Sequence, residues 1–497
     1  MSTRSLLVRG ALWISLTRIL VNMIGFASTI ILARLLVPED FGLVAIAGSV
    51  AAIVGAISEL SLSQALIQHD DPQEDHFHTA FTMNALRAVL LALVLAALGW
   101  PASVAYGDDR LIALMSAFAL ANLIGGLVNP RLALFERRLE FHQWVILSGG
   151  EKLAGFVVAA SIAFAFQSYW ALVASVVASQ VARVVASYLL MSYRPRLTLL
   201  HYKELLSFSI WLTLGQMVQS LNWRADPLLI AAFLPTRAVG HYSMGHRVAT
   251  LAVGEVLQPI SQVLFPAFSR LKNEPERLKE AYLRAQGLLC MIAMPIGFGV
   301  AATADPLVAL FLGNNWTGAG PVIQFLAVAA AIQRAQQLQP IAMATGSTKM
   351  LFYRDLRALF IRVPLTIGGL IFGPELGVGA LPGALIGHTI SSVINTLLNM
   401  HLASKISLVT VREQCMGVWR PIIAAVAMAA AVLAGLDFAA TLGSPNIVIA
   451  LALGISMGVV VYPIAIIILW LLAGRPRGAE SDALALILQQ YASLRSR

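Results

Sequence analysis

Fourteen apolar segments, each about 20 residues or longer, follow one another along this chain of 497 residues. About 20 apolar residues in a helix cross the roughly 30 Å hydrocarbon core of a bilayer, so each segment predicts a membrane-spanning helix. A transmembrane β-barrel would instead show alternating segments of about 10 residues. The sequence therefore predicts an all-α polytopic membrane protein. The predicted spans are 10–34, 42–67, 80–100, 111–133, 144–166, 170–191, 207–233, 243–268, 283–303, 320–344, 355–373, 380–404, 418–437 and 447–473.

The composition excludes the main soluble classes. Apolar residues make up 58% of the chain and charged residues 12%, about half the ~25% that is usual in soluble globular proteins. A disordered chain, a disulfide scaffold and an ordinary cytosolic enzyme are therefore excluded. Cys290 and Cys415 lie far apart and predict neither a disulfide framework nor a metal site. The first apolar stretch contains Arg18 and is too long for a cleavable signal peptide.

Lysine and arginine are distributed very unevenly between the two predicted sides of the membrane. With the N-terminus inside, the inner segments hold 23 of the 34 Lys and Arg residues, whereas the outer segments hold three, Arg34, Arg110 and Arg237. Positive charge accumulates on the cytoplasmic side of membrane proteins. Because the number of predicted spans is even, we expect both termini to be cytoplasmic.

An internal repeat relates the first and seventh predicted spans. When the chain is shifted by 198 positions, 11 of the 56 residues from Ala11 to Leu66 are identical to those from Ser209 to Leu264. The identities include a paired tryptophan, a paired turn glycine and a shared Ser-Gln-x-Leu sequence. An even number of spans lies between the repeats, so both copies have the same orientation. Parallel repeats predict two lobes with a cavity between them, and this arrangement is typical of transporters that work by alternating access.

The repeat gives a domain organisation with two lobes of six helices each. The predicted parts are 1–195 with spans 1 to 6, 196–410 with spans 7 to 12, 411–475 with spans 13 and 14, and a cytoplasmic tail, 476–497.

A series of short motifs, in order along these spans, resembles a known family. The chain contains Ile30–Leu43, Leu62–Gln68, Thr79–Phe81, Asp226, Gly240–Ser243, Leu264–Leu271 and Gly313–Trp316. This series resembles the Wzx-type polysaccharide flippases, in the polysaccharide transporter branch of the MOP/MATE-like superfamily, which also holds multidrug MATE exporters and the lipid II flippase. The resemblance extends from the N-terminus to about residue 410.

The resemblance implies a bacterial inner-membrane flippase rather than an enzyme. Its expected substrate is an undecaprenyl-pyrophosphate-linked oligosaccharide, which moves from the cytoplasmic to the periplasmic leaflet for exopolysaccharide, capsule or O-antigen synthesis. The expected fold has two six-helix bundles around a central cavity. Membrane lipids, a polymerase and chain-length or export proteins of the same pathway are the expected partners. Neither nucleic acid nor a cofactor is expected, although the superfamily includes members coupled to protons or sodium.

Polar residues inside the spans are the candidates for the transport site. A charged side chain at the bilayer centre costs about 2.5–3.5 kcal/mol on insertion scales, so such residues are expected to face a cavity or a partner. The candidates are Arg18, Asn22, Gln216, Gln219, Ser220, Asn222, Arg224, Asp226, Arg247, Glu255, Arg334, Gln337 and Arg362. Arginine suits a bidentate grip on phosphate, and the amides suit sugar hydroxyls.

Two of these candidates, Asp226 and Glu255, could also carry protons or bind a cation. The alternative interpretation of the whole set is structural, with ion pairs between helices and charges that snorkel to the membrane surface.

Two other functions remain open at this point. A cation-coupled MATE-like drug exporter would favour an acidic, aromatic cavity, whereas the charges within these spans are mostly arginine. A membrane polysaccharide polymerase or ligase usually has a large outer loop with catalytic residues, and the predicted outer loops here have about ten residues or fewer.

Two further clusters predict ordinary turns. The loop from His69 to His78 is rich in metal-ligating residue types, but no ligand spacing stands out, so we expect a solvated turn and no metal. The acidic pair in Pro38–Gly42 is interpreted as part of a tight turn.

Overall fold

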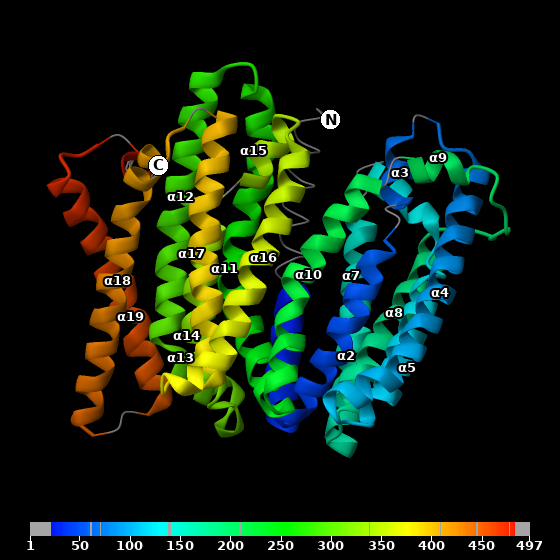
Figure 1. Ribbon diagram of the computed structural model, residues 1–497, viewed down its shortest axis with the longest axis horizontal. Coiled ribbons are helices and arrows are strands. Elements are labelled where there is room, and N and C mark those ends of the chain that lie inside the picture. The colour runs from blue at the N-terminus through cyan, green and yellow to red at the C-terminus, as the bar shows by residue number, and fades with distance from the viewer. Residues whose placement is uncertain are drawn as a thin grey trace, which may run out of the picture. The chain divides into compact units, whose positions relative to one another are not determined.

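The chain is helical throughout the part that the computed structural model describes (Figure 1). That part comprises residues 21–59, 62–69, 71–137, 141–207, 210–336, 338–407, 409–443, 446–476 and 478–482, and no strand occurs in it. The contacts divide the chain into two compact units, Met1–Gly240 and His241–Arg497. The prediction of an all-α membrane protein is confirmed.

The first unit begins, in its described part, with a helix at Val21–Leu35. It continues with α2 (Pro38–Ile57), α3 (Leu62–Gln68), α4 (Glu74–Tyr106), α5 (Arg110–Gly125), η1 (Pro130–Leu132), α6 (Ala133–Arg137), α7 (Phe141–Phe166), α8 (Trp170–Leu190), α9 (Tyr202–Ser207) and α10 (Ile210–Phe233). Helix α11 (Thr236–Leu271) starts in this unit and continues into the second.

The second unit contains the remaining helices. They are α12 (Pro275–Ala302), α13 (Ala304–Leu307), η2 (Val308–Leu312), η3 (Asn314–Trp316), α14 (Ala319–Arg334), α15 (Leu338–Ala344), α16 (Thr348–Glu375), α17 (Ala380–Ser407), α18 (Val411–Thr441) and α19 (Ile447–Leu472).

Within the described residues, every predicted span overlaps at least one helix, and span 111–133 covers α5, η1 and the first residue of α6. Spans 42–67 and 320–344 each cover a pair, α2 with α3 and α14 with α15. In the described part of the chain, ten helices are long and apolar enough to cross a membrane, and two shorter apolar helices accompany them. Apolar run length therefore located the helices well, because the bilayer requires that length.

The structure differs from one predicted turn at the start of α2. The expected tight turn at Pro38–Gly42 is instead the first turn of the helix. Pro38 takes the first helical position, where its missing N–H costs nothing. The carboxylate of Asp40 accepts a hydrogen bond of 3.3 Å from the amide of Val37, so the acidic side chain caps the helix.

Neighbouring helices of the first unit pack in hairpins. Helix α4 packs along α5, α7 along α8, and α5 against α8, while α10 packs along α2. The contact with α2 places α10 in the first unit, although the repeat assigned it to the second lobe. Contacts and sequence repeats are different criteria, so the predicted lobe boundaries remain a prediction.

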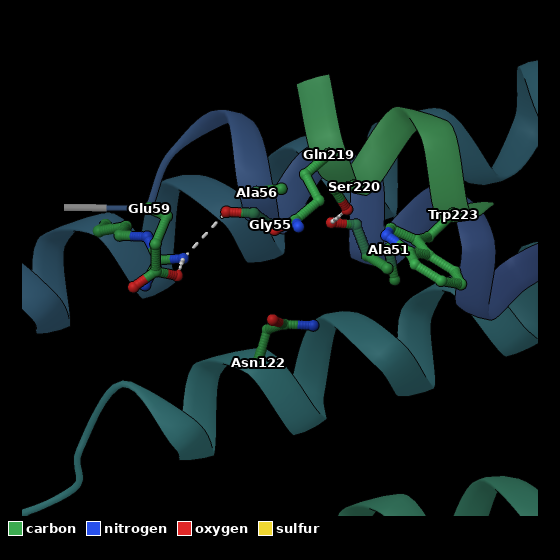
Figure 2. Close-up of a pocket in the computed structure, with 10 residues that line it drawn as sticks. Ala51, Gly55, Ala56, Glu59, Asn122, Gln219, Ser220 and Trp223 are labelled. Carbon is green, nitrogen blue, oxygen red and sulfur yellow. Dashed lines mark hydrogen bonds and ion pairs between the residues drawn. The ribbon is translucent and has the colours of Figure 1, made fainter. Parts of the chain in front are cut away.

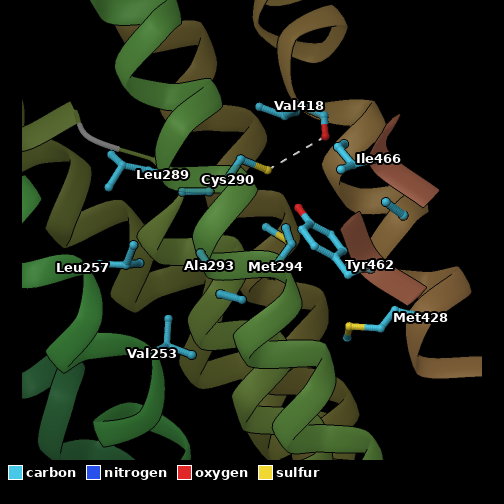
Figure 3. Packing of buried hydrophobic residues seen from close by; sticks show 14 of the residues in the cluster. Val253, Leu257, Leu289, Cys290, Ala293, Met294, Val418, Met428, Tyr462 and Ile466 are labelled. Atoms are coloured by element: carbon cyan, nitrogen blue, oxygen red, sulfur yellow. Dashed lines mark hydrogen bonds between the residues drawn. The ribbon is translucent and has the colours of Figure 1, made fainter. Parts of the chain in front are cut away.

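The second unit has a continuous apolar core. Helix α12 packs between α14 and α18, and α18 packs along α19. Figure 3 shows Cys290 and Met294 of α12 on the side that faces Val418 of α18 and Tyr462 of α19. The hydroxyl of Tyr462 donates a hydrogen bond of 2.8 Å to the carbonyl of Met291, which fixes α19 to α12.

Helices α16 and α17 approach each other closely through glycine. A Cβ added to Gly369 would lie 2.1 Å from the carbonyl oxygen of Gly383, and one added to Gly383 would lie 2.1 Å from the carbonyl oxygen of Gly369. Gly373 and Gly387 continue these rows at a spacing of four. Small residues at this spacing let membrane helices pack backbone to backbone, which gives α16 a fixed position.

Candidate functional site

The first unit contains a cavity of about 720 Å³ between α2, α4, α5 and α10. The size lies within the roughly 300–1,000 Å³ of typical ligand sites. Its wall on α2 consists of small residues, Ala51, Ala52, Gly55 and Ala56, which leave the space open. Its polar lining comprises Glu59, Arg87, Asn122, Gln219, Ser220 and Trp223.

Helix α10 contributes one face to this cavity. Gln219 and Ser220 are adjacent on it, and Trp223 follows about one turn later, so all three lie on one side of the helix. Figure 2 shows them opposite Asn122 of α5. The hydroxyl of Ser220 donates a hydrogen bond of 3.4 Å to the carbonyl of Ala52 on α2. The amides, the hydroxyl and the indole N–H give the cavity many neutral hydrogen-bonding groups.

The charged part of the lining is an ion pair. Nη2 of Arg87 donates to Glu59 at 2.8 Å and to the carbonyl of Gly55 at 3.0 Å. Its Nε donates to the hydroxyl of Ser58 at 3.1 Å. The Arg87 side chain is 21% exposed, so these contacts hold a mostly buried cation of α4 against the end of α2.

A second cavity, of about 400 Å³, adjoins the same ion pair. Glu59, Arg87 and Asn122 line both cavities, and Gln180 and Arg183 of α8 belong to the second. Arg87 therefore lies between two polar spaces of the first unit.

The structure places the predicted site residues of the first unit in different surroundings. Gln219 and Ser220 line the large cavity. Asn222 and Asp226 are buried, at 9% and 2% exposure, and Arg224 is exposed.

Three further candidates of this unit are not part of the lining given for this cavity. Asn22 is half-buried. Arg18 and the side chain of Gln216 lie outside the described residues.

The candidates of the second unit are distributed over three helices. Arg247 of α11 is exposed, and Glu255 of the same helix, Arg334 of α14 and Arg362 of α16 are half-buried. The Arg334 guanidinium lies against α11, because a Cβ added to Gly254 would lie 3.5 Å from its Nη2. Gln337 lies outside the described residues.

The ion pair between Arg87 and Glu59 is not among the site residues predicted from the sequence. Arg87 lies inside the predicted span 80–100, and its charge met the criterion that selected the other candidates. Asn122, inside span 111–133, could have been found in the same way. Glu59 lies at the end of α2, and only the fold brings it to Arg87.

A second polar cluster joins the loop before α4 and the first turn of α4, which includes the buried His76, to α9. Nε2 of His69 lies 2.8 Å from Glu204, Nε2 of His76 lies 3.4 Å from it, and Nδ1 of His201 lies 3.4 Å from it. The rings of His76 and His201 stack with centroids 3.9 Å apart. Hydrogen bonds from the histidines, that from His69 first, lower the pKa of the Glu204 carboxyl below its usual 4.5.

The hydrogen bonds of His69 and His76 determine which ring nitrogen carries the hydrogen. Nδ1 of His69 accepts a hydrogen bond of 3.2 Å from the amide of Asp71, and Nδ1 of His76 accepts one of 3.2 Å from the amide of Gln73. A neutral ring that accepts at Nδ1 carries its hydrogen on Nε2, which here faces Glu204. Such a nitrogen donates to the carboxylate and has no lone pair for a metal.

Comparisons with known proteins identify both a family and a fold. A family model described as "Polysaccharide biosynthesis protein" matches residues 31–321. The chain is 27% identical over 454 residues to the succinoglycan biosynthesis transport protein ExoT of Rhizobium meliloti, with 89% of each chain covered.

Two solved structures share the fold. The inward closed conformation of the lipid II flippase MurJ matches with a TM-score of 0.68 at 13% identity, covering 92% of this chain and 99% of that one. An inward-facing multidrug resistance MATE transporter of the MOP superfamily matches with a TM-score of 0.58 at 14% identity, covering 78% and 95%. The predicted MOP/MATE-like fold is confirmed.

Proposed function

Because this chain belongs to the polysaccharide biosynthesis protein family, we propose that it is a flippase for undecaprenyl-pyrophosphate-linked oligosaccharide repeat units. It would move them from the cytoplasmic to the periplasmic leaflet by alternating access, without covalent chemistry. The name of the 27% identical relative, a succinoglycan biosynthesis transport protein, supports an exopolysaccharide substrate. The observation that carries the proposal is the polar cavity around Arg87 in an otherwise apolar helical unit.

The chemistry of the cavity suits a sugar phosphate. Asn122, Gln219 and Ser220 offer donors and acceptors of the kind that sugar hydroxyls need, and Trp223, 44% exposed, offers a flat apolar face. The Arg87 guanidinium can exchange its contact with Glu59 for one with a pyrophosphate oxygen. Because Glu59 pairs with the Arg87 guanidinium, the cavity avoids an unpaired buried charge until a substrate binds.

The predicted residues outside this cavity remain part of the proposal. Arg18, Asn22, Arg224, Arg247, Arg334 and Arg362 would contact the substrate at other stages of its passage, with Gln216, Asn222 and Gln337. Asp226, which is buried, and Glu255, which is half-buried, would carry a proton or bind sodium if transport is ion-coupled. A polymerase and chain-length or export proteins would act next on the flipped product.

Arg87→Ala provides the central test in a strain that lacks the chromosomal copy. We expect loss of surface polysaccharide with normal membrane levels of the variant, and lipid-linked repeat units trapped in the cytoplasmic leaflet. Arg87→Lys should restore little activity, since lysine cannot form the same forked contact. Full export by Arg87→Ala would refute the assigned site.

Arg284 provides a matched control for that variant. Leu283-Arg284-Ala285 has the same sequence as Leu86-Arg87-Ala88 and follows the second copy of the repeat as that segment follows the first. Arg284, however, pairs with Glu280 on the surface of α12, where both side chains are more than half exposed. Arg284→Ala removes the same charge from an exposed position and should leave export unchanged.

The leaflet assay also separates the two rival functions. If repeat units already lie in the periplasmic leaflet in the deletion strain, the defect is in polymerisation and the protein is a polymerase or ligase. If polymer and leaflet distribution are both unchanged, while sensitivity to toxic cations rises, the protein is a drug exporter.

The orientation is a proposal of its own. We place both termini in the cytoplasm, Arg237 outside and Arg277 inside. Single cysteines at these positions, in a background without Cys290 and Cys415, should react with an impermeant maleimide from the periplasmic side at 237 only. Labelling at position 277 alone would show that the orientation is the opposite of the one proposed.

A further inference from the structure

Helix α16 lines a further cavity, of about 400 Å³, which is separate from the two cavities beside Arg87 and which the proposed function does not use. Its lining consists of Lys349, Met350, Tyr353, Arg354 and Arg357 of α16, together with Leu402 of α17. Residues 349, 353 and 357 are four apart, so they follow one face of the first turns of the helix. All of these residues belong to the second unit.

The charges of this cavity are unequally balanced. Arg354 donates from Nε at 2.9 Å and from Nη2 at 2.6 Å to the carboxylate of Asp355, so its forked edge is occupied. The lining includes Lys349 and Arg357 as further cations and contains no acidic residue. The cavity is therefore positive, and the N-terminus of α16 adds the positive end of the helix dipole.

The guanidinium of Arg357 provides the decisive observation. Its Nε and Nη2 are buried and have no hydrogen-bond partner among the residues that the structure describes. These two nitrogens form the edge of arginine that binds two oxygens of one phosphate or carboxylate group. Buried donors without an acceptor are rare in folded proteins, and they point to a group that is absent here.

The remaining lining indicates what that group is attached to. Met350 and Leu402 are apolar, and Tyr353 is 56% exposed. Tyrosine at the end of a membrane helix commonly lies at the level of the lipid headgroups, and basic pockets between such helices bind anionic headgroups. Helix α16 is one of the helices long and apolar enough to cross the membrane.

We propose that Arg357 and Lys349 form a binding site for the phosphate group of a lipid. The forked edge of Arg357 takes two phosphate oxygens, Lys349 adds a second positive charge, and the hydrocarbon chain lies along Met350 and Leu402. The same chemistry fits a glycerophospholipid of the bilayer and a polyprenyl phosphate. The site goes beyond the proposed function and does not depend on it.

Native mass spectrometry of the purified full chain in detergent tests the site. The probes are phosphatidylglycerol, undecaprenyl phosphate and, as a phosphate-free lipid, diacylglycerol. We expect at least one phosphate lipid to bind at least tenfold more tightly than diacylglycerol. Arg357→Gln should remove that preference, and Lys349→Gln should reduce it.

Three controls make the result decisive. Arg277→Gln removes an exposed arginine of the same unit that pairs with Glu274 at 2.6 Å, and it should bind lipid as the wild type does. Arg357→Lys keeps the charge but not the fork, and should restore part of the preference. The phosphate lipid should raise the thermal unfolding midpoint of the wild type but not of Arg357→Gln, which also shows that the variant is folded.

The outcomes distinguish the source of the phosphate. Preference for phosphatidylglycerol assigns the site to a bilayer lipid, and preference for undecaprenyl phosphate assigns it to the isoprenoid carrier. Equal binding of all three probes, or a preference that Arg357→Gln leaves intact, overturns the proposal. The lipid-binding measurement and the export test with Arg87→Ala are independent, so either proposal can fail without the other.

Discussion

Gly42 of α2 lies directly against the backbone of Gly240 of α11. A Cβ added to Gly42 would lie 2.9 Å from the amide nitrogen of Gly240 and 1.9 Å from the carbonyl oxygen of Thr236. A Cβ added to Gly240 would lie 1.8 Å from the carbonyl oxygen of Pro38. Only glycine fits at both positions, because the opposing atoms belong to the backbone and cannot rotate away.

This contact joins equivalent residues of the two copies of the internal repeat. The two glycines are 198 positions apart, and so are the two residues whose carbonyls they meet. Glu39 and Arg237, also 198 positions apart, form an ion pair at 3.5 Å. Equivalent residues that contact one another in this way are the mark of a local two-fold relation.

Gly240→Ala should lower the free energy of unfolding by about 1–3 kcal/mol, the usual cost of overpacking. The physical reason is the clash with the Pro38 carbonyl, which forces α2 and α11 apart. Thermal unfolding in detergent measures the effect. Gly25→Ala is the control, since a Cβ there meets nothing within 4 Å. Equal midpoints for the two variants would contradict this account.

The repeat and the helices could be predicted because each depends on local sequence. Run length predicts a span, and a shifted comparison finds paired residues such as Gly42 and Gly240. The site was harder to predict, because its central pair combines Arg87 with a residue 28 positions away. The amphipathic pattern of α10 identified Gln219 and Ser220, whereas no local signal told a lining residue from the buried Asp226.

The histidine cluster is a second example of contacts that the sequence alone does not predict. His69 and His76 were visible in the sequence as metal-ligating residue types, but Glu204, 135 positions from His69, could not be connected to them. The hydrogen bonds to their Nδ1 atoms, which determine the protonated nitrogen, come from backbone amides and carry no sequence signal.

Acid should destabilise the junction between α9 and the loop before α4. The folded-state pKa of Glu204 lies below the usual 4.5, so its ionised form stabilises the fold above that pH, and the stabilisation is lost as the pH falls through the folded-state value. Glu204→Gln removes this contribution. Between pH 6 and pH 3.5, the unfolding midpoint of the wild type should therefore fall more steeply than that of the variant.

Glu276→Gln is the control for this pH dependence, because Glu276 is exposed in the first turn of α12. Its midpoint should follow the wild-type curve. If the Glu204→Gln curve also follows the wild type at every pH, the cluster contributes nothing to stability through this carboxylate.

Zinc should not bind tightly at the cluster, although three metal-ligating residues lie within reach of one another. His69, His76 and Glu204 have ligand atoms within 4.8 Å of each other. Metal binding at Nε2 would move the ring hydrogen to Nδ1, where it would face the amide hydrogens of Asp71 and Gln73. Isothermal titration calorimetry with Zn²⁺ should give the same weak binding for the wild type and for His76→Asn. Tight binding by the wild type that His76→Asn abolishes would contradict this prediction and would show that the loop rearranges to bind the metal.

The segment after α19 is held by a buried ion pair. Nε of Arg420 on α18 lies 2.7 Å from Glu480, and both side chains are 8% exposed. Removing one partner of such a pair typically costs about 3–5 kcal/mol, because the other charge stays buried. Glu480→Ala should therefore release the segment, and limited proteolysis should remove a C-terminal tag at least tenfold faster. Asp482→Ala, at an exposed position, should leave the rate unchanged.

The last prediction concerns the carboxylate beside Arg87. Glu59 accepts the Arg87 hydrogen bond that we assign to the pyrophosphate, so it competes with the substrate. Glu59→Gln keeps the size of the side chain and removes its charge, and a hydrogen bond to a charged group contributes about 1.5–3 kcal/mol. Binding of undecaprenyl pyrophosphate to the purified chain should therefore strengthen about tenfold. Addition of Arg87→Ala to this variant should abolish the gain, because no guanidinium remains for the phosphate to reach. Weaker binding in Glu59→Gln alone would mean that the carboxylate positions Arg87 for the substrate instead of competing with it.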